Sequence, residues 1–144
     1  MSKIKKSDIE LDINDPRGEF NINSYYYSVF QFTYRKYERM NIGLILFNKK
    51  ICLYDFIDIE NSDLLKYTQS KQSKFENHIM LKELINSIKF ELKEIIYKEH
   101  NMVFELYDYL TEPNLYINAT CPEKYISSLP CTEVFGALLN NYVN

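Results

Sequence analysis

Few side chains in this sequence have the types and spacing that catalysis or metal binding requires. The two histidines, His78 and His100, would stand about 33 Å apart on one continuous helix, so they cannot share a metal ion. The three cysteines, Cys52, Cys121 and Cys131, form no C-x-x-C pair, and their odd number is typical of reduced thiols in the cytosol. The sequence therefore predicts no metal centre and no cofactor.

Glycine is too rare and too scattered for the loops that bind phosphates. The three glycines, Gly18, Gly43 and Gly136, are isolated from one another. A phosphate-binding loop and a G-x-S-x-G nucleophile elbow both need clustered glycines, because the backbone must turn sharply or approach the ligand closely. P-loop, Rossmann and α/β-hydrolase enzymes are therefore excluded.

Carboxylates supply the one enzymatic alternative. Glu38, Asp55 and Asp58 fall on or beside neighbouring predicted strands. Carboxylate oxygens are the ligands that Mg²⁺ prefers, so a small metal-dependent nuclease-like or nucleotide-handling enzyme is the second hypothesis.

Composition sets the class of protein. The chain has 144 residues, a formal net charge of −3, and 13 Tyr and 9 Phe but no Trp. This length suits one domain, and the negative balance argues against affinity that comes from neutralising phosphates. The sequence has no run of about eighteen apolar residues and no apolar segment after its basic start. We therefore expect no membrane partner, no secretory signal and a cytoplasmic location.

The first part of the chain predicts an arm followed by strands. Residues 1–23 are polar and predict a mobile N-terminal arm, in which alternating apolar residues favour strand addition to a sheet edge. Residues 24–34 are rich in β-branched and aromatic residues and predict a strand. Residues 40–47 predict a central strand, since they are apolar on both faces. A polar connector at 48–50 then predicts a hairpin to a strand at 51–57.

Helical patterns follow, with one strand between them. A short helix is expected around residues 64–68, and Ser73 opens an amphipathic helix of some 25 residues. Its predicted core stripe includes Ile79. Asn101 predicts a stop and a restart before a helix at 103–110.

The C-terminal part predicts one further strand and one further helix. Residues 115–120 alternate and predict a strand that Cys121-Pro122 ends, and a C-terminal helix is expected from about Thr132. The order predicts a single α+β domain over residues 24–144, with helices packed on one face of a largely antiparallel sheet.

One motif carries a resemblance. The aromatic strand segment Tyr27–Phe32 is followed by Glu38-x-x-Asn41-Ile42-Gly43 and an apolar run. This block resembles the start of an uncharacterised bacterial family, domain of unknown function 3037, and a weaker resemblance extends to residue 143. The sequence departs from the family pattern at two places: in the connector at 35–37, and at Pro122, which is displaced from its usual position. The resemblance implies genes beside those of HipA-like kinases, and so an accessory or antitoxin-like role in a toxin–antitoxin or phage defence setting.

The three motif residues have a structural and a functional interpretation. Gly43 inside an apolar strand indicates a bulge or the close approach of another backbone, and Asn41 can satisfy stray backbone groups. Glu38 can pair with Arg35 or Arg39 at the strand end. The functional interpretation is a polar pocket in which Glu38 and Asn41 bind a partner's basic or amide group. We expect the structural interpretation to explain most of this pattern.

The aromatic strand is the other candidate surface. Alternation places two sets of side chains on opposite faces of the sheet. One set is Tyr26, Ser28, Phe30, Phe32 and Tyr34, and the other is Tyr25, Tyr27, Val29, Gln31 and Thr33. An aromatic core face with a tyrosine-rich outer face is expected, and exposed tyrosine is typical of protein-contact surfaces. Stacking of single-stranded nucleic acid is the third hypothesis, disfavoured because no basic stripe accompanies the aromatics.

These observations favour a non-enzymatic protein-interaction domain. Contact is expected through the tyrosine-rich face, the N-terminal arm, or both. The candidate partner-binding residues are Glu38, Arg39, Asn41, Tyr25, Tyr27 and Tyr34, and Gly43 is expected to be structural.

Overall fold

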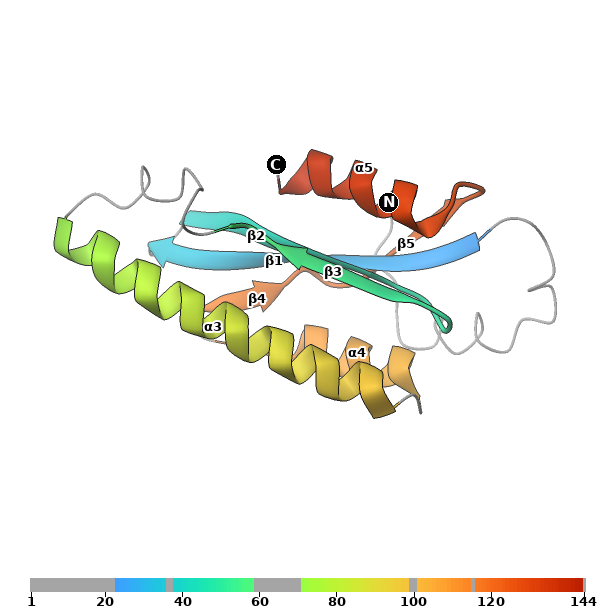
Figure 1. Ribbon diagram of the computed structural model, residues 1–144, viewed down its shortest axis with the longest axis horizontal. Coiled ribbons are helices and arrows are strands. Elements are labelled where there is room, and N and C mark those ends of the chain that lie inside the picture. Colours follow the sequence, from blue (N-terminus) through green and yellow to red (C-terminus); the bar gives the residue numbers. More distant parts are fainter. Residues whose placement is uncertain (1–22, 36–37, 59–70, 99–100, 115, 144) are drawn as a thin grey trace.

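The computed structural model describes residues 23–35, 38–58, 71–98, 101–114 and 116–143 (Figure 1). The predicted arm, apart from Asn23, and the predicted short helix at 64–68 lie outside these residues. In chain order the described elements are β1 (Asn23–Arg35), β2 (Glu38–Phe47), β3 (Cys52–Phe56), α3 (Lys71–Lys98), α4 (Met102–Thr111), β4 (Ile117–Ala119), β5 (Glu123–Ser127) and α5 (Cys131–Tyr142).

The described strands form one antiparallel sheet, which confirms the α+β class and the meander of the first three strands. The order across the sheet is β3-β2-β1-β4, and β5 also pairs with β1. One edge of β1 pairs with β2. Its other edge pairs with β5 over residues 23–27 and with β4 over residues 30–32. β1 is therefore the strand to which every other described strand except β3 is bonded.

The last strand, β5, is the element that the sequence does not predict. The chain was expected to leave the sheet at Pro122, but there the pairing with β1 is only interrupted. Proline has no N–H to donate to a ladder. Thr120 bonds to β1 instead: its Oγ1 accepts the Val29 N–H, and its own N–H donates to the Val29 carbonyl, both at 2.9 Å. The chain then rejoins β1 as a short polar strand that is recognisable only by its pairing.

Asparagines shape two of the connections. In the β2–β3 turn, Oδ1 of Asn48 accepts the N–H groups of Lys50 and Ile51 at 2.8 and 2.9 Å, as in an Asx turn. Between α3 and α4, Asn101 adopts the left-handed conformation with φ 56° and ψ 33°, which separates the two helices. The predicted hairpin connector and the predicted helix stop at Asn101 are both confirmed.

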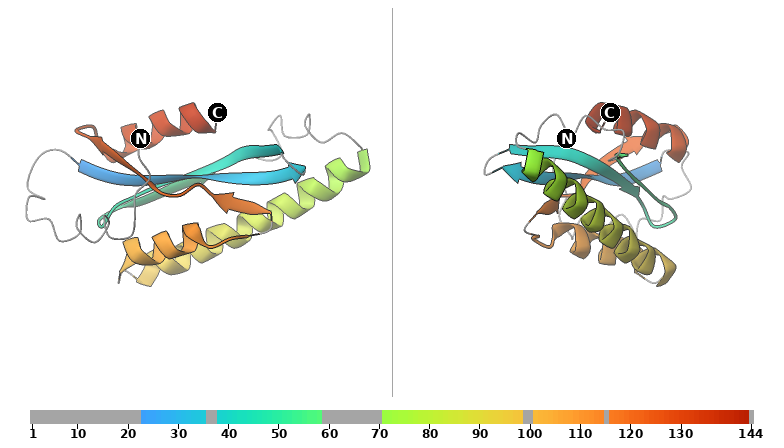
Figure 2. Two further views of the ribbon diagram at one scale, coloured as in Figure 1. Left: turned by 180° about the vertical axis from the view of Figure 1, so that it is seen from behind. Right: turned by 60° about the vertical axis from the view of Figure 1, so that its left-hand side comes forward.

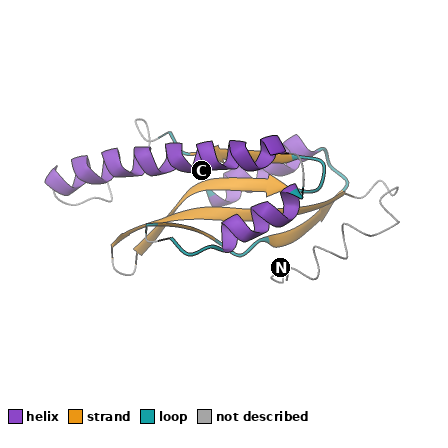
Figure 3. Ribbon diagram, turned by 90° about the horizontal axis from the view of Figure 1, so that it is seen from below, coloured by secondary structure: helices purple, strands orange, loops and turns teal. Residues whose placement is uncertain are grey.

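Helices cover both faces of the sheet, which corrects the prediction that they all pack on one face. α3 and α4 lie against one face, and α5 lies against the other (Figures 1 and 3). The physical reason lies in β1 and β2, whose residues 25–30 and 42–47 are all buried. Strands that are apolar on both sides need a covering layer on each side.

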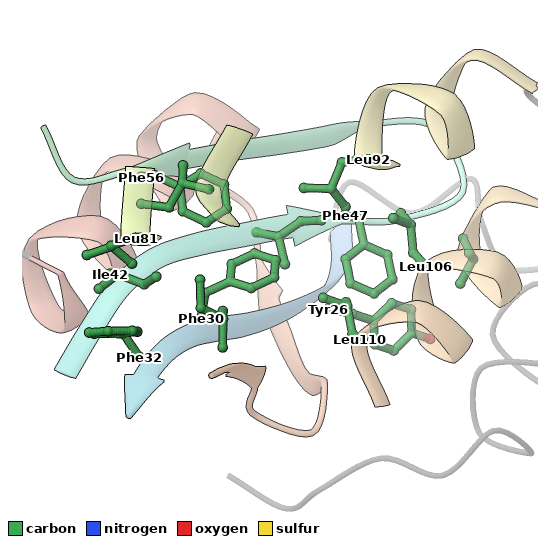
Figure 4. Packing of buried hydrophobic residues seen from close by; sticks show 14 residues of the cluster. Tyr26, Phe30, Phe32, Ile42, Phe47, Phe56, Leu81, Leu92, Leu106 and Leu110 are labelled. Atoms are coloured by element: carbon green, nitrogen blue, oxygen red, sulfur yellow. The ribbon is translucent and has the colours of Figure 1, made fainter. Parts of the chain in front are cut away.

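Two apolar clusters result from this arrangement, and they separate the two faces of β1 as the alternation predicts. The larger cluster lies between the sheet and α3 with α4 (Figure 4) and includes Tyr26, Phe30, Phe32, Ile42, Ile45, Phe47, Phe56, Leu81, Leu92 and Leu106. The smaller cluster lies under α5 and consists of the buried residues Tyr25, Tyr27, Val29, Leu44, Leu46, Val134 and Leu138.

The longest helix, α3, confirms the predicted amphipathic helix. It begins at Lys71, slightly before the expected start at Ser73. Its core side carries Leu81, Ile85 and Leu92, none of them more than 3% exposed. In the part of the chain that the structure describes, no helix combines the length and the apolar character that crossing a membrane requires.

Gly43 lies beneath a contact between two aromatic rings. Phe30 and Phe56 are its partners on the two neighbouring strands, and their ring centroids are 5.0 Å apart. A Cβ atom on Gly43 would stand 2.5 Å from Cδ1 of Phe56. The β1–β2 register also shifts beside this pair, between Phe30 and Gln31. The register shift confirms the predicted bulge. The group that comes closest to Gly43 is the Phe56 ring, a side chain and not the backbone that the sequence predicts, and the absent side chain of Gly43 leaves room for it.

Replacing Gly43 with alanine should lower the free energy of unfolding by about 1–3 kcal/mol, because the added methyl group must displace the Phe56 ring or the sheet backbone. Gly136→Ala in α5 is the matched control, since a Cβ there meets nothing within 4 Å. We expect this control to stabilise the protein by about 0.5–1 kcal/mol through helix propensity. Urea unfolding measures both changes, and a Gly43→Ala variant as stable as the wild type would contradict the packing role.

Candidate functional site

Tyr25 and Tyr27, two of the predicted partner-binding residues, are buried inside the protein. Each is 3% exposed, and both belong to the cluster under α5 with Val134 and Leu138. The predicted alternation is correct, but the prediction of a tyrosine-rich outer face is wrong. Alternation tells which residues share a face, whereas it does not tell whether a partner or the chain's own C-terminal helix covers that face.

The hydroxyl of Tyr27 ties the sheet to the elements around it. It donates to Oε2 of Glu123 at 2.8 Å and lies 3.2 Å from the hydroxyl of Tyr142. Its ring packs against the rings of Tyr125 and Tyr142, with centroids 6.4 and 5.7 Å away. Burial raises the pKa of Tyr27, and the hydrogen bonds to Tyr142 and Glu123 raise it further. Tyr27 therefore stays protonated and joins β1, β5 and α5.

Asn41 performs the structural task that the sequence suggests for it. Its Nδ2 donates to the backbone carbonyl of Tyr142 at 2.8 Å, and its Oδ1 accepts from Nε2 of Gln31 at 3.0 Å. The last carbonyls of a helix have no partner within the helix, so this amide satisfies one of them. Asn41 thus anchors the C-terminal end of α5 to the sheet.

Among the described side chains of the motif block, neither Arg39 nor Gly43 joins Asn41 in one open pocket. Arg39 is exposed and lies opposite Thr33 in the β1–β2 register. In the same register, the backbone of Glu38 lies opposite that of Arg35. The side chains of Glu38 and Tyr34 lie outside what the structure describes, so their partner-binding role stays a prediction. Gly43 leaves room for the Phe56 ring on the α3 side of the sheet, whereas Asn41 hydrogen-bonds to α5 on the other side.

The carboxylates of the enzymatic alternative do not form a cluster in the described structure. Asp55 and Asp58 are both exposed, and Oδ1 of Asp55 accepts the N–H of Phe56 at 2.9 Å. Among the described side chains, no three His, Cys, Asp or Glu residues are grouped so that they could hold a metal ion. This hypothesis also needs the side chain of Glu38, which is not described, so it stays a prediction.

The nucleic-acid alternative needs an open aromatic face, and helices occupy both faces of β1. Phe30 and Phe32 lie in the cluster under α3 and α4, and Tyr25 and Tyr27 lie in the cluster under α5. None of these four side chains is more than 3% exposed. Bases therefore cannot stack on them while the helices stay in place.

The cysteines differ in their surroundings. Burial raises the pKa of Cys52 to about 12, so its thiol is protonated at neutral pH. Cys121 lies between β4 and β5. Cys131 begins α5, one residue before the helix start expected at about Thr132.

Exposed apolar residues gather on the side of α3 that faces away from the sheet. Phe90 is 66% exposed, Tyr97 is 89% exposed and Ile79 is 43% exposed. At 3.6 residues per turn, these three positions fall within about 20° of one another around the helix. We call these three residues the outward stripe. They lie on the side opposite the buried Leu81 and Leu92.

Sequence reasoning misses this surface. It assigns Ile79 to the core stripe, which is wrong, and it leaves Phe90 and Tyr97 unassigned. Their angular position around the helix is the signal that would have revealed them. Phe90 and Tyr97 are two aromatic residues seven positions apart, and both lie off the apolar stripe of the same helix. An apolar side chain off the stripe has no place in the core unless another element covers it.

A pocket of about 320 Å³ lies between α3 and the end of β3, and Lys82, Lys89 and Asp58 are among its lining residues. The ammonium of Lys89 lies 5.9 Å from the ring centroid of Phe56, where a cation–π contact holds the lysine over the core. The basic groups of α3 therefore face β3 on this flank.

Replacing Asn41 with alanine should cost about 1–3 kcal/mol in unfolding free energy, because it leaves the Tyr142 carbonyl and the Gln31 amide without their partner. Hydrogen exchange of the α5 amides should accelerate more than exchange in α3. Arg39→Ala, on the same strand but exposed, is the control and should change stability by less than about 0.5 kcal/mol. If the two variants unfold alike, Asn41 does not anchor α5.

The raised pKa of Tyr27 predicts a loss of stability in alkali. The folded state keeps the phenol protonated, whereas the unfolded chain ionises it near pH 10, so this part of the stability is present below about pH 10 and falls as the pH rises further. Between about pH 8 and about pH 11, Tyr27→Phe should therefore lose less unfolding free energy than the wild type. Tyr97→Phe, at an 89% exposed position, should follow the wild-type curve. Parallel curves for wild type and Tyr27→Phe would show that the folded state does not hold this proton.

No family model, no curated protein and no solved structure matches this chain. Its function has to be argued from its own residues.

Proposed function

We propose that this chain is a protein-interaction domain and that the outward stripe of α3 is its contact surface. The observation that carries this proposal is the exposure of Phe90 and Tyr97, at 66% and 89%, on a helix whose opposite side is buried in the core. These large aromatic side chains lie off the core stripe and are mostly exposed, so they contribute little to the packing of the described core. They are also the residue types that dominate the binding energy of protein interfaces.

The geometry of the stripe suits recognition by a groove. Phe90 and Tyr97 are seven residues apart, so they project from the same side two turns apart along the helix. Ile79 extends the stripe to about 27 Å of helix length at 1.5 Å per residue. Lys93 and Glu94 lie between the two aromatics and are exposed, which provides a polar rim. The partner would therefore present an apolar groove for one helix face.

The first partner to test is a HipA-like kinase, as the resemblance of the Glu38-x-x-Asn41-Ile42-Gly43 block implies. In this setting the chain would be an accessory or antitoxin-like protein of a toxin–antitoxin or phage defence system. Binding through α3 agrees with the burial of Tyr25 and Tyr27, because this surface remains open while α5 covers the tyrosines. Strand addition by residues 1–23 remains a second proposed contact.

The proposal is tested by crosslinking followed by affinity measurement. A photoreactive phenylalanine analogue is placed at position 90, 97 or 129 in cells that also make the HipA-like kinase. Leu129 is the matched control, because it is 50% exposed and lies between β5 and α5. This segment leads into α5, which lies on the other side of the sheet from α3 (Figure 1). We expect positions 90 and 97 to crosslink to the kinase and position 129 to remain unlinked.

With the purified kinase, Phe90→Ala should weaken binding by about 30-fold or more, the effect of losing a central aromatic contact. Leu129→Ala should bind as the wild type does, and neither variant should change the melting temperature by more than a few degrees. A kinase that binds Phe90→Ala and Tyr97→Ala at wild-type affinity, or that crosslinks only from position 129, would contradict the stripe as contact surface.

A further inference from the structure

A second pocket, of about 250 Å³, lies on the other flank of α3, where α3, α4 and β4 meet. Figure 2 shows α3 and α4 side by side with β4 above them. Glu91 contributes to this pocket and follows Phe90 directly, so it points about 100° away from the outward stripe. The pocket is therefore a separate surface, and its ligand does not depend on the proposed function.

The pocket has an apolar floor and a polar rim. We call the floor those lining side chains that carry no polar atom and that belong to the apolar core or pack against it, namely Phe30, Ile88, Leu110, Ile117 and Ala119. We call the rim the remaining lining residues, which are partly or largely exposed, namely Glu91, Tyr109, Glu112, Pro113 and Asn114. Pockets that recognise small groups combine an apolar wall with a few placed polar atoms in this way.

The charged groups on the rim have one sign. Glu91 and Glu112 carry carboxylates, and the described residues that line the pocket include no lysine, arginine or histidine. Burial, a hydrogen bond to Glu91 and the negative charges of Glu91 and Glu112 raise the pKa of Tyr109. Two carboxylates therefore act on one phenol at the mouth of the pocket.

The end of α4 adds to this negative potential. The pocket surrounds the C-terminal end of the helix, where Glu112 is the capping residue and the last turn has no basic side chain. A helix C-terminus carries partial negative charge and is normally matched by cations. Here the capping residue is Glu112, so its carboxylate and the helix end both contribute negative potential beside the pocket.

The apolar floor of the pocket indicates which kind of cation would bind there. A metal ion would need several oxygen ligands arranged around it, and no group of three acidic, His or Cys side chains exists among the described residues. An apolar floor instead favours a ligand that carries hydrocarbon next to its charge. An ammonium group on an alkyl chain can place its charge between Glu91 and Glu112 and its carbons against Leu110 and Ile117.

We propose that the pocket between α3, α4 and β4 binds a primary ammonium group with a short alkyl stem. Such a group is supplied by a free alkylamine or by the side chain of a lysine in a partner protein. The same carboxylates would bind either one, because the recognised atoms are identical.

The proposal is tested with three probes and the full chain: n-butylammonium, Nα-acetyl-lysine amide and n-butanol. In two-dimensional NMR spectra, the two amines should shift the amide signals of Leu110, Asn114 and Ile117 in a saturable way, and they should raise the melting temperature. n-Butanol has the same hydrocarbon without the charge and should leave these signals in place. Tighter binding of the lysine amide indicates a partner's lysine as the source, and tighter binding of n-butylammonium indicates a free amine.

Charge-matched variants separate the site from a general effect of charge. Glu91→Gln with Glu112→Gln should weaken amine binding by about tenfold or more, as expected for the loss of charge-assisted hydrogen bonds. Glu83→Gln with Glu133→Gln removes the same charge from exposed positions of α3 and α5 outside the pocket and should leave binding unchanged. The proposal is overturned if neither amine shifts the pocket amides, if n-butanol binds equally well, or if both double variants lose binding to the same extent.

Discussion

The structure depends on the burial of β1 on both faces and its pairing on both edges. A strand in this position needs a partner strand on each side and an apolar layer above and below. β2 supplies one edge, and the segment β4–β5 supplies the other, with Thr120 bonding to Val29 where Pro122 cannot. α3 with α4 and α5 supply the two layers. The remaining features of the fold follow because one short chain has to pair both edges of β1 and cover both of its faces.

The motif residues have their places because of the same constraint. Asn41 and Tyr27 hold a short helix, α5, over the second face by polar contacts with Tyr142. Gly43 makes room on the first face for the Phe30–Phe56 contact, which closes the core at the edge of the sheet. The block Glu38-x-x-Asn41-Ile42-Gly43 is thus explained, at Asn41 and Gly43, by the assembly of the core. Its conspicuous pattern is compatible with a binding site elsewhere on the molecule.

The surfaces open to other molecules lie on the helices. α3 packs one side into the core and turns Phe90 and Tyr97 outward. Its two flanks differ in charge, because Lys82 and Lys89 line the pocket toward β3 whereas Glu91 lines the pocket toward α4. One helix therefore combines an apolar stripe with a basic and an acidic flank. This arrangement supports our proposal that recognition proceeds through the helical layer.

The sequence by itself determined the types of the described elements other than β5, the two faces of β1, the connector at residues 48–50 and the helix boundary at residues 100–101, and it favoured structural roles for Asn41 and Gly43. These features depend on local periodicity and on the backbone preferences of single residues. Only the tertiary structure decided that α5 covers Tyr25 and Tyr27, that β5 rejoins β1 after Pro122, and that Phe90 and Tyr97 remain outside. The first two outcomes depend on contacts between residues about a hundred positions apart, such as Tyr27 with Tyr142, for which no local pattern carries a signal. The phase of Phe90 and Tyr97 on α3 is a local signal, but only the packing of the other elements decides that these two side chains stay exposed.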